Sequence, residues 1–271
     1  MASTQHESPK ALVKALAILE VIAEHRDGLS LAKLSQSMEI PKPTIHRLVQ
    51  PLIEHRLLQA TDEGYRLGAQ CLVFGTRFIE AVDLRQEARD VLADLVSHSG
   101  ETCHLGVMDG HRVVYIEKVE SAHAVRMHSR VGSTNPVHST GVGKAMLAHV
   151  SAELLDEIVT EGLEQRTPAT LTEAGALWED LARSRERGYA IDDIENEDGI
   201  RCVAAPVFDN GGSVVAGLSI AGPVHRVTRD RFTELGERVR EAALELSKRI
   251  GYLGDLPVGG QGFGGKEKLG E

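Results

Sequence analysis

The chain has 271 residues, 42% hydrophobic and 26% charged, which is ordinary for a soluble globular protein and enough for two domains. No apolar run predicts a membrane span, and the polar segment Met1–Pro9 lacks the apolar core of a secretory signal. Three widely spaced cysteines, Cys71, Cys103 and Cys202, favour a reducing, cytoplasmic location over a disulfide framework.

The net charge of −10 argues against nucleic-acid binding, which draws on lysine and arginine to neutralise phosphates. The acidity is not spread evenly, however. Residues 1–70 contain eight Lys or Arg and eight Asp or Glu, so this segment is neutral and the negative charge belongs to the rest. A small DNA-binding domain on an acidic body is compatible with these counts.

The first 70 residues predict three helices. Ser8-Pro9 has the pattern of a helix start, and Asp27-Gly28 that of a helix end. Between them apolar residues recur at the spacing of one helical face: Leu12, Ala15, Leu16, Leu19, Ile22 and Ala23. Ser30 caps a second, short helix. The third helix runs from about Pro41 to His55, with five apolar residues turned inward: Ile45, Leu48, Val49, Leu52 and Ile53.

Two short strands follow, at 57–60 and 65–67, joined by a turn at 61–64. Three helices and a hairpin predict a winged helix-turn-helix domain over residues 8–70. Residues 71–98 predict linker helices, broken or bent near Gly75.

From residue 99 the pattern changes to strands in hairpins with helices outside, which predicts an antiparallel α+β domain over 99–252. The expected strands are 102–108, 111–119, 124–131, 189–193, 200–208 and 213–221, and the expected helices are 144–149, 152–161, 173–187 and 229–250. Asp109-Gly110 suits a type I′ turn between the first two strands. The glycine-rich tail, 253–271, is expected to be disordered.

In a helix-turn-helix the second helix of the pair lies in the major groove with its first residues at base edges. Arginine and lysine can donate to guanine, and glutamine suits adenine. The residues expected to contact DNA are Lys42, Pro43, Thr44, His46, Arg47 and Gln50 on the third helix, and Arg66 on the wing. Pro51 is expected to bend this helix or to confine base contacts to its first turns. A winged helix that binds protein instead of DNA is the alternative.

Three segments resemble the IclR family of bacterial regulators. The first is the helix-turn-helix 34–48. The second is the spacing of Gly188, Asp192, Glu195, the run 202–204 and the run 207–209. The third is the loop and helix start 138–145. The resemblance covers about residues 8–252, and the sequence departs from the family pattern at Pro43, where serine is common, and at Pro51.

This resemblance implies a winged helix-turn-helix, a linker helix and a GAF-like sensor domain. It also implies a homodimer or homotetramer on double-stranded operator DNA, and a small carboxylate effector such as a keto, sugar or aromatic acid. Neither a cofactor nor a metal is expected. The predicted role is a ligand-responsive regulator of a catabolic gene cluster, a repressor in preference to an activator.

The segment Gly141-Val142-Gly143 leads into a helix, whose free backbone N–H groups attract anions. Cys202 and Ser219 lie mid-strand among small residues, a face expected to leave room for a ligand. By the resemblance the effector-binding residues are Met127, Gly141, Val142, Asp192, Cys202 and Ser219. Asp192 beside an anion would be protonated, or would accept a hydrogen bond from a ligand hydroxyl, which favours a hydroxy or sugar acid. Ala221 replaces a serine of some relatives.

Two other classes of protein are weighed. In an enzyme Cys202 would be the nucleophile, with His104, His128 or His138 as the base. In a metalloprotein Cys103 and His104 would be ligands, but adjacent strand residues point to opposite faces. Neither pattern is specific, since a lone cysteine is more often a small buried hydrophobe.

Overall fold

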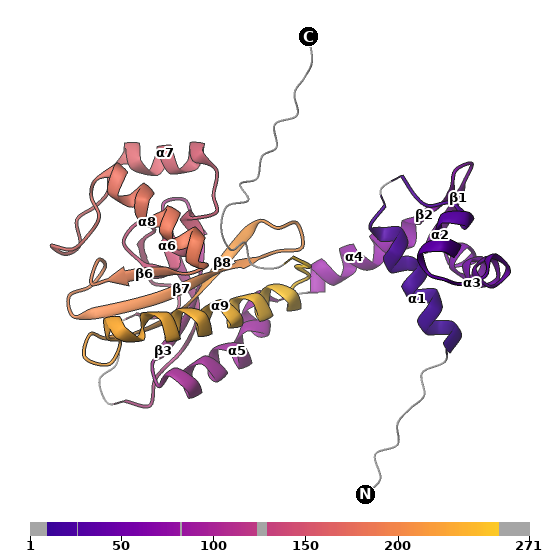
Figure 1. Cartoon of the computed structure of the whole chain (residues 1–271). Coiled ribbons are helices and arrows are strands. Elements are labelled where there is room, and N and C mark those ends of the chain that lie inside the picture. The colour runs from indigo at the N-terminus through magenta and orange to yellow at the C-terminus, as the bar shows by residue number, and fades with distance from the viewer. Residues whose placement is uncertain (1–9, 26, 82, 124–128, 255–271) are drawn as a thin grey trace, which may run out of the picture. The chain divides into compact units, whose positions relative to one another are not determined.

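The computed structural model describes residues 10–25, 27–81, 83–123 and 129–254. The chain divides into two compact units, Met1–Val82 and Asp83–Glu271, each drawn in Figure 1 with most of its elements labelled. Among the described residues no helix has the length and apolar character needed to cross a bilayer.

The first unit is a winged helix-turn-helix, as the sequence predicts. Its elements are α1 (Lys10–Ala23), α2 (Leu31–Ser37), α3 (Lys42–Glu54), β1 (Leu58–Thr61), β2 (Gly64–Leu67) and α4 (Ala69–Ala81). Ser30 caps α2, because its hydroxyl accepts a hydrogen bond from the backbone N–H of Lys33. The strands β1 and β2 form an antiparallel hairpin, and Tyr65 extends it by a bridge to Leu29.

The buried face of α1 agrees only in part with its apolar spacing: of the predicted residues, Ile22 is buried and Ala15 and Leu19 pack against the core. Ile18 and Ile22 are buried in the core of the first unit, but Leu12 and Leu16 are half exposed, at 56% and 50%. The helix is apolar on more than one side, so periodicity alone does not choose the side that packs. An apolar surface therefore remains on α1.

The predicted break near Gly75 is wrong. Helix α4 continues through Gly75 to Ala81, and α5 (Leu84–Ser99) begins after Asp83. A single glycine costs a helix only about 1 kcal/mol. Asp83 instead fixes the start of α5, because its carboxylate accepts hydrogen bonds from the backbone N–H groups of Arg85 and Gln86.

Within its described residues, the second unit is built on one antiparallel sheet of six strands in the order β5-β4-β3-β8-β7-β6. The strands are β3 (Thr102–Asp109), β4 (Arg112–Val119), β5 (Thr134–Pro136), β6 (Ala190–Asp193), β7 (Ile200–Phe208) and β8 (Val214–Pro223). The two long hairpins, β3–β4 and β7–β8, are joined at the centre by pairing of β3 with β8.

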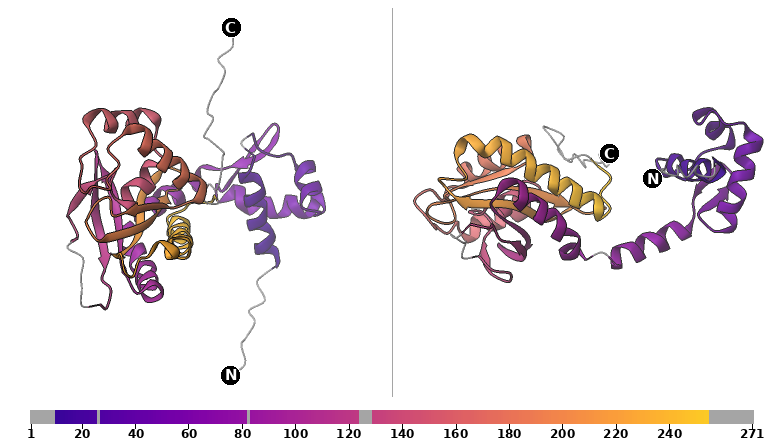
Figure 2. Two further views of the ribbon diagram at one scale, coloured as in Figure 1. Left: turned by 60° about the vertical axis from the view of Figure 1, so that its left-hand side comes forward. Right: turned by 90° about the horizontal axis from the view of Figure 1, so that it is seen from below.

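Helices cover both faces of this sheet. They are α6 (Gly141–Leu147), α7 (Ala152–Glu161), α8 (Ala174–Arg187) and α9 (Phe232–Arg249), the last preceded by a 3₁₀ turn at Arg229–Arg231. Figures 1 and 2 show α5 and α9 side by side on one face, and α6, α7 and α8 on the other. The α+β class predicted for this part of the chain is confirmed.

Three predicted strand details differ from the structure. The loop of the first hairpin is Gly110-His111, one residue later than predicted, since Asp109 pairs with Arg112. The strand expected over 124–131 falls mostly outside the described residues, and 129–131 form no strand. Strand β5, a three-residue edge strand that ends in proline, was not predicted.

Candidate functional site

In the first unit, α3 buries one side and presents a polar row on the other. Ile45, Val49 and Leu52 lie in the core. The predicted DNA-contacting residues of α3 are exposed, except Thr44, which is half-buried: Lys42, Pro43, His46, Arg47 and Gln50. Among these, His46 and Gln50 contact each other, their Nε2 atoms 3.4 Å apart. The first turns of α3 therefore offer hydrogen-bond donors to solvent.

Pro51 does not end α3, in agreement with the predicted extent of this helix to about His55. The helix runs through Pro51 to Glu54, and the backbone N–H of His55 donates to the carbonyl of Pro51 at 3.0 Å. Proline has no N–H for the carbonyl of Arg47, so one bond of the helix is missing. Burial of Val49 and Leu52 on either side of Pro51 keeps this turn in place.

Arg66 lies on strand β2 of the wing, and its side chain is exposed. Its guanidinium donates to Oε1 of Gln59 on β1, at 3.3 Å from Nε and 3.2 Å from Nη2. This neutral partner leaves the positive charge of Arg66 uncompensated, so it can still attract a phosphate.

In the second unit, the sheet register places three of the predicted sensor residues on one face. Asp192 pairs with Cys202, and Cys202 pairs with Ala221, across β6, β7 and β8. Two residues along the strands, and so on the same face, Ala204 pairs with Ser219, and Ser219 pairs with His104 of β3. Directly opposed residues share a face of a sheet. Asp192, Cys202 and Ser219 are thus brought together, whereas Met127 lies outside the described residues.

Helix α6 packs directly on this face. A Cβ atom at Gly141 would lie 2.7 Å from Sγ of Cys202, and one at Gly106 would lie 2.9 Å from Cγ1 of Val142. A Cβ atom at Gly217 would also crowd Val142, at 3.1 Å. The small residues expected to leave room for a ligand therefore admit α6 instead at these positions. They also bring Gly141 and Val142 against the predicted sensor residues.

Asp192 is buried, at 4% exposure, and one of its oxygens is committed to the backbone. Oδ1 accepts from the N–H of Glu195 at 2.7 Å and of Asn196 at 3.3 Å. Burial, followed by the charge of Glu195, raises the pKa of Asp192 from its ordinary 3.8 to about 7, against the opposing effect of Lys144. Near neutral pH this carboxyl can therefore carry a proton and donate it to an anion.

Lys144, which is not among the residues predicted for the site, is fully buried on α6. Its ammonium donates to Oδ2 of Asp180 at 2.8 Å and to Oε1 of Glu195 at 2.6 Å. Burial alone would lower the pKa of Lys144, but Glu195 and Asp180 raise it above the ordinary value. A lysine among the otherwise apolar side chains of this short helix was a signal that such carboxylates must exist.

His104 is a further polar group on the sensor face. Its Nε2 lies 2.8 Å from Oγ of Ser129, its Nδ1 lies 3.4 Å from Oγ of Ser219, and its ring lies 5.0 Å from that of Tyr115. Burial, and then the charge of Lys118, lowers its pKa to about 3, so the imidazole is neutral.

These contacts do not assemble a cysteine nucleophile. Burial and the charge of Asp192 raise the pKa of Cys202 far above its ordinary value. His104 bonds the two serines, and Nε2 of His138 lies 3.0 Å from the carbonyl of Glu164. The third histidine considered, His128, lies outside the described residues. Within the described part of the chain, no three His, Cys, Asp or Glu side chains are grouped to hold a metal.

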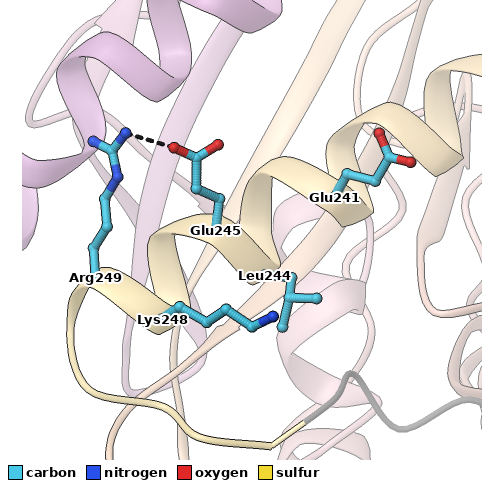
Figure 3. A pocket seen from close by; sticks show the side chains of 5 residues that line it. All are labelled: Glu241, Leu244, Glu245, Lys248 and Arg249. Carbon is cyan, nitrogen blue, oxygen red and sulfur yellow. Dashed lines mark hydrogen bonds and ion pairs between the residues drawn. The ribbon is translucent and has the colours of Figure 1, made fainter. Parts of the chain in front are cut away.

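A surface pocket lies elsewhere, on α9, where Glu241, Leu244, Glu245, Lys248 and Arg249 line it. Figure 3 shows these side chains along one side of the helix, with Arg249 bonded to Glu245. None of the predicted sensor residues contributes to it.

Two protein-family models match most of the chain. The model of the IclR helix-turn-helix domain matches residues 11–62, and that of the bacterial transcriptional regulator IclR C-terminal domain matches 76–248. The HTH-type transcriptional regulator XynR of Escherichia coli is 37% identical over 90% of this chain and 98% of its own. The transcriptional repressor IclR of the same organism is 36% identical over 90% and 91%. The crystal structure of the Agrobacterium tumefaciens repressor BlcR superposes with a TM-score of 0.80 at 29% identity, covering 90% of this chain and 98% of that one.

Proposed function

The chain belongs to the IclR family of bacterial transcriptional regulators, and from this we propose that it is a repressor that leaves its operator when a small carboxylate binds the second unit. The observation that carries the DNA-binding part is the row of exposed donors on the first turns of α3, with Arg66 on the wing. The family consists of regulators that bind DNA, and nothing in the site supports an enzyme.

The DNA contacts are tested best by Arg47→Ala. The probe is a gel shift with the promoter region next to the gene of this protein, over a range of salt concentrations. Loss of a base contact should weaken specific binding by about 1–3 kcal/mol, whereas loss of a phosphate contact should lower the salt slope by about 1. Arg238→Ala, an exposed arginine of α9 in the second unit, is the matched control. No binding by the unmodified protein would favour a protein-binding winged helix.

Repression, as opposed to activation, is supported by the relatives, several of which are described as repressors. An activator remains the second candidate, since XynR is described only as a regulator. A promoter fusion assayed with and without the gene of this protein decides between them. Expression should rise when the gene is deleted.

We further propose a homodimer or homotetramer on DNA. Its support is apolar surface in the first unit: Leu12, Val13 and Leu16 on α1, and Leu72, Val73 and Phe74 on α4, are at least 39% exposed. Such side chains are expected to be covered in an assembly. Substituting Leu72 and Phe74 by glutamine should shift sedimentation toward the monomer. Leu253→Gln, at another exposed leucine, should not.

The effector that we propose is a small acid bound by Met127, Gly141, Val142, Asp192, Cys202 and Ser219. A protonated Asp192 can donate a hydrogen bond to a carboxylate of the effector, and an ionised Asp192 can accept one from a hydroxyl. A hydroxy or sugar acid, which carries both groups, therefore fits this residue. Binding would favour one arrangement of the linker, residues 71–98, and so change DNA affinity by a population shift. Screening small acids for thermal stabilisation tests this, because a ligand of the folded state raises the melting temperature. Saturating acid that leaves DNA affinity unchanged would contradict the coupling.

A further inference from the structure

Residues 192–196, which span the end of β6 and the bend after it and are here called the Asp192 turn, are strained and tightly held. Ile194 has a φ of +68°, a conformation that is costly for a β-branched residue and persists only where neighbours enforce it. The hydroxyl of Thr167 donates to the carbonyl of Ile194, and that of Thr170 donates to the carbonyl of Glu195, each at 2.6 Å. These contacts fix where the carboxyls of Asp192 and Glu195 lie.

Each of these two carboxyls has one bonded and one open oxygen. Oδ1 of Asp192 accepts from the two backbone N–H groups of the turn. Oε1 of Glu195 accepts from the ammonium of Lys144 at 2.6 Å. Oε2 of Glu195 is buried without a partner in the described part of the chain, and no hydrogen bond to Oδ2 of Asp192 is found there either. Each carboxyl of the pair therefore keeps one oxygen that can still accept a hydrogen bond.

The cations near the pair are bonded to Glu195 and Asp180, and among the described residues none is bonded to Asp192. Lys144 of α6 is the cation bonded to Glu195, but it is shared with Asp180 of α8. The other titratable or charged groups that act on the pair or on Asp180 are Arg183 and Arg187 of α8, Cys202 of β7 and Tyr115 of β4. The thiol and phenol stay neutral, because burial raises their pKa values. Two buried carboxylates beside one shared ammonium favour retention of a proton.

We propose that Lys144 is a positioning residue of the effector site: its ammonium fixes Glu195 beside Asp192, and the pair binds an anionic effector together with one proton. The proton lies on Oδ2 of Asp192 and is donated to the effector carboxylate, while Glu195 stays ionised against Lys144. This inference rests on the proposed binding of an acid at Asp192. Above neutral pH the complex must take its proton from water, so affinity falls tenfold for each further pH unit.

The role of Lys144 is tested without any effector. The full chain, labelled with ¹³C at the aspartate carboxyls, is titrated by NMR, and the Asp192 signal is assigned by its absence in Asp192→Asn. Lys144→Met should raise the Asp192 midpoint by roughly one pH unit, and Glu195→Gln should lower it by a similar amount. A purely structural role predicts that both variants lose stability with the midpoint unchanged, and that result would overturn the proposal.

Asp180→Asn is the matched control, because it breaks the other ion pair of the same ammonium. It should cost stability and move the Asp192 midpoint less than either variant. If Lys144→Met does not fold, Glu195→Gln and Lys144→Arg still decide the question. The first must lower the midpoint, and the second, which keeps the charge, must leave it in place; failure of either overturns the proposal.

A second measurement separates this proposal from the proposed acid sensing. Glycolate, pyruvate and gluconate are tested for thermal stabilisation of the full chain at pH 6 and pH 8. An acid that binds at pH 6 should bind the unmodified chain about tenfold less tightly at pH 8 than at pH 6. A binding acid whose affinity does not change with pH overturns the proton linkage. If none of the three binds at either pH, their role as effectors fails, and the NMR midpoints still decide the role of Lys144.

Discussion

Asp192→Asn should stabilise the second unit at pH 8 and leave it almost unchanged at pH 4. The folded pKa of about 7 lies above the ordinary value of 3.8, so the folded chain binds more protons between these limits than the unfolded chain. The contribution of the Asp192 carboxyl to the stability of the unmodified protein is therefore fully present below about pH 4 and is lost as the pH rises to about 7. At 1.36 kcal/mol for each pH unit, the loss amounts to at most about 4 kcal/mol.

Asparagine keeps the Oδ1 acceptor for the backbone N–H groups of Glu195 and Asn196 but cannot ionise, so its stability should not show this fall. Urea unfolding of the full chain is followed by the fluorescence of Trp178, the only tryptophan of the sequence, which lies on α8 and so reports the second unit. A stability difference between variant and unmodified protein that is the same at pH 4 and pH 8 would refute the reasoning.

Two further predictions concern packing and thiol chemistry. Gly143→Ala should unfold the second unit or destabilise it by several kcal/mol, because the new Cβ would lie 2.0 Å from a backbone oxygen. Gly175→Ala should instead stabilise this unit by up to about 1 kcal/mol, because no atom lies within 4 Å of the new Cβ. Thermal melts compare the two variants. At pH 8 iodoacetamide should modify the partly exposed Cys71 and spare Cys103 and Cys202, because burial raises the pKa values of these two thiols. Mass spectrometry of the labelled peptides checks this. Rapid labelling of Cys202 in the folded chain would reopen the enzyme alternative.

Strong periodicity made much of the fold predictable. Strand β7 and helix α7 occupy the predicted residues, since the first is apolar except for Arg201 and the second has a serine cap. The linker was predicted less well. Gly75 looks like a break, but an exposed glycine is a weak perturbation, and the capping carboxylate of Asp83 sets the true boundary.

The candidate site was predictable only where the family pattern marks it. The family pattern named Asp192, Cys202 and Ser219, but neither it nor the strand spacing could show that α6 fills the space beside Cys202. The ion pairs of Lys144 join residues 36 and 51 positions apart, and no local pattern links such partners. Helix α1 shows the same limit, because the side that packs depends on helices distant in sequence.

The pairing of β3 with β8 has a consequence for how the second unit folds. His104 lies opposite Ser219, 115 residues later in the chain, so the centre of the sheet closes only after the last strand has been synthesised. Until then the hairpin β3–β4 has an open edge on the ribosome, and such edges invite pairing with other chains. Contacts of this sequence separation also slow folding. Chains truncated before residue 214 should therefore aggregate.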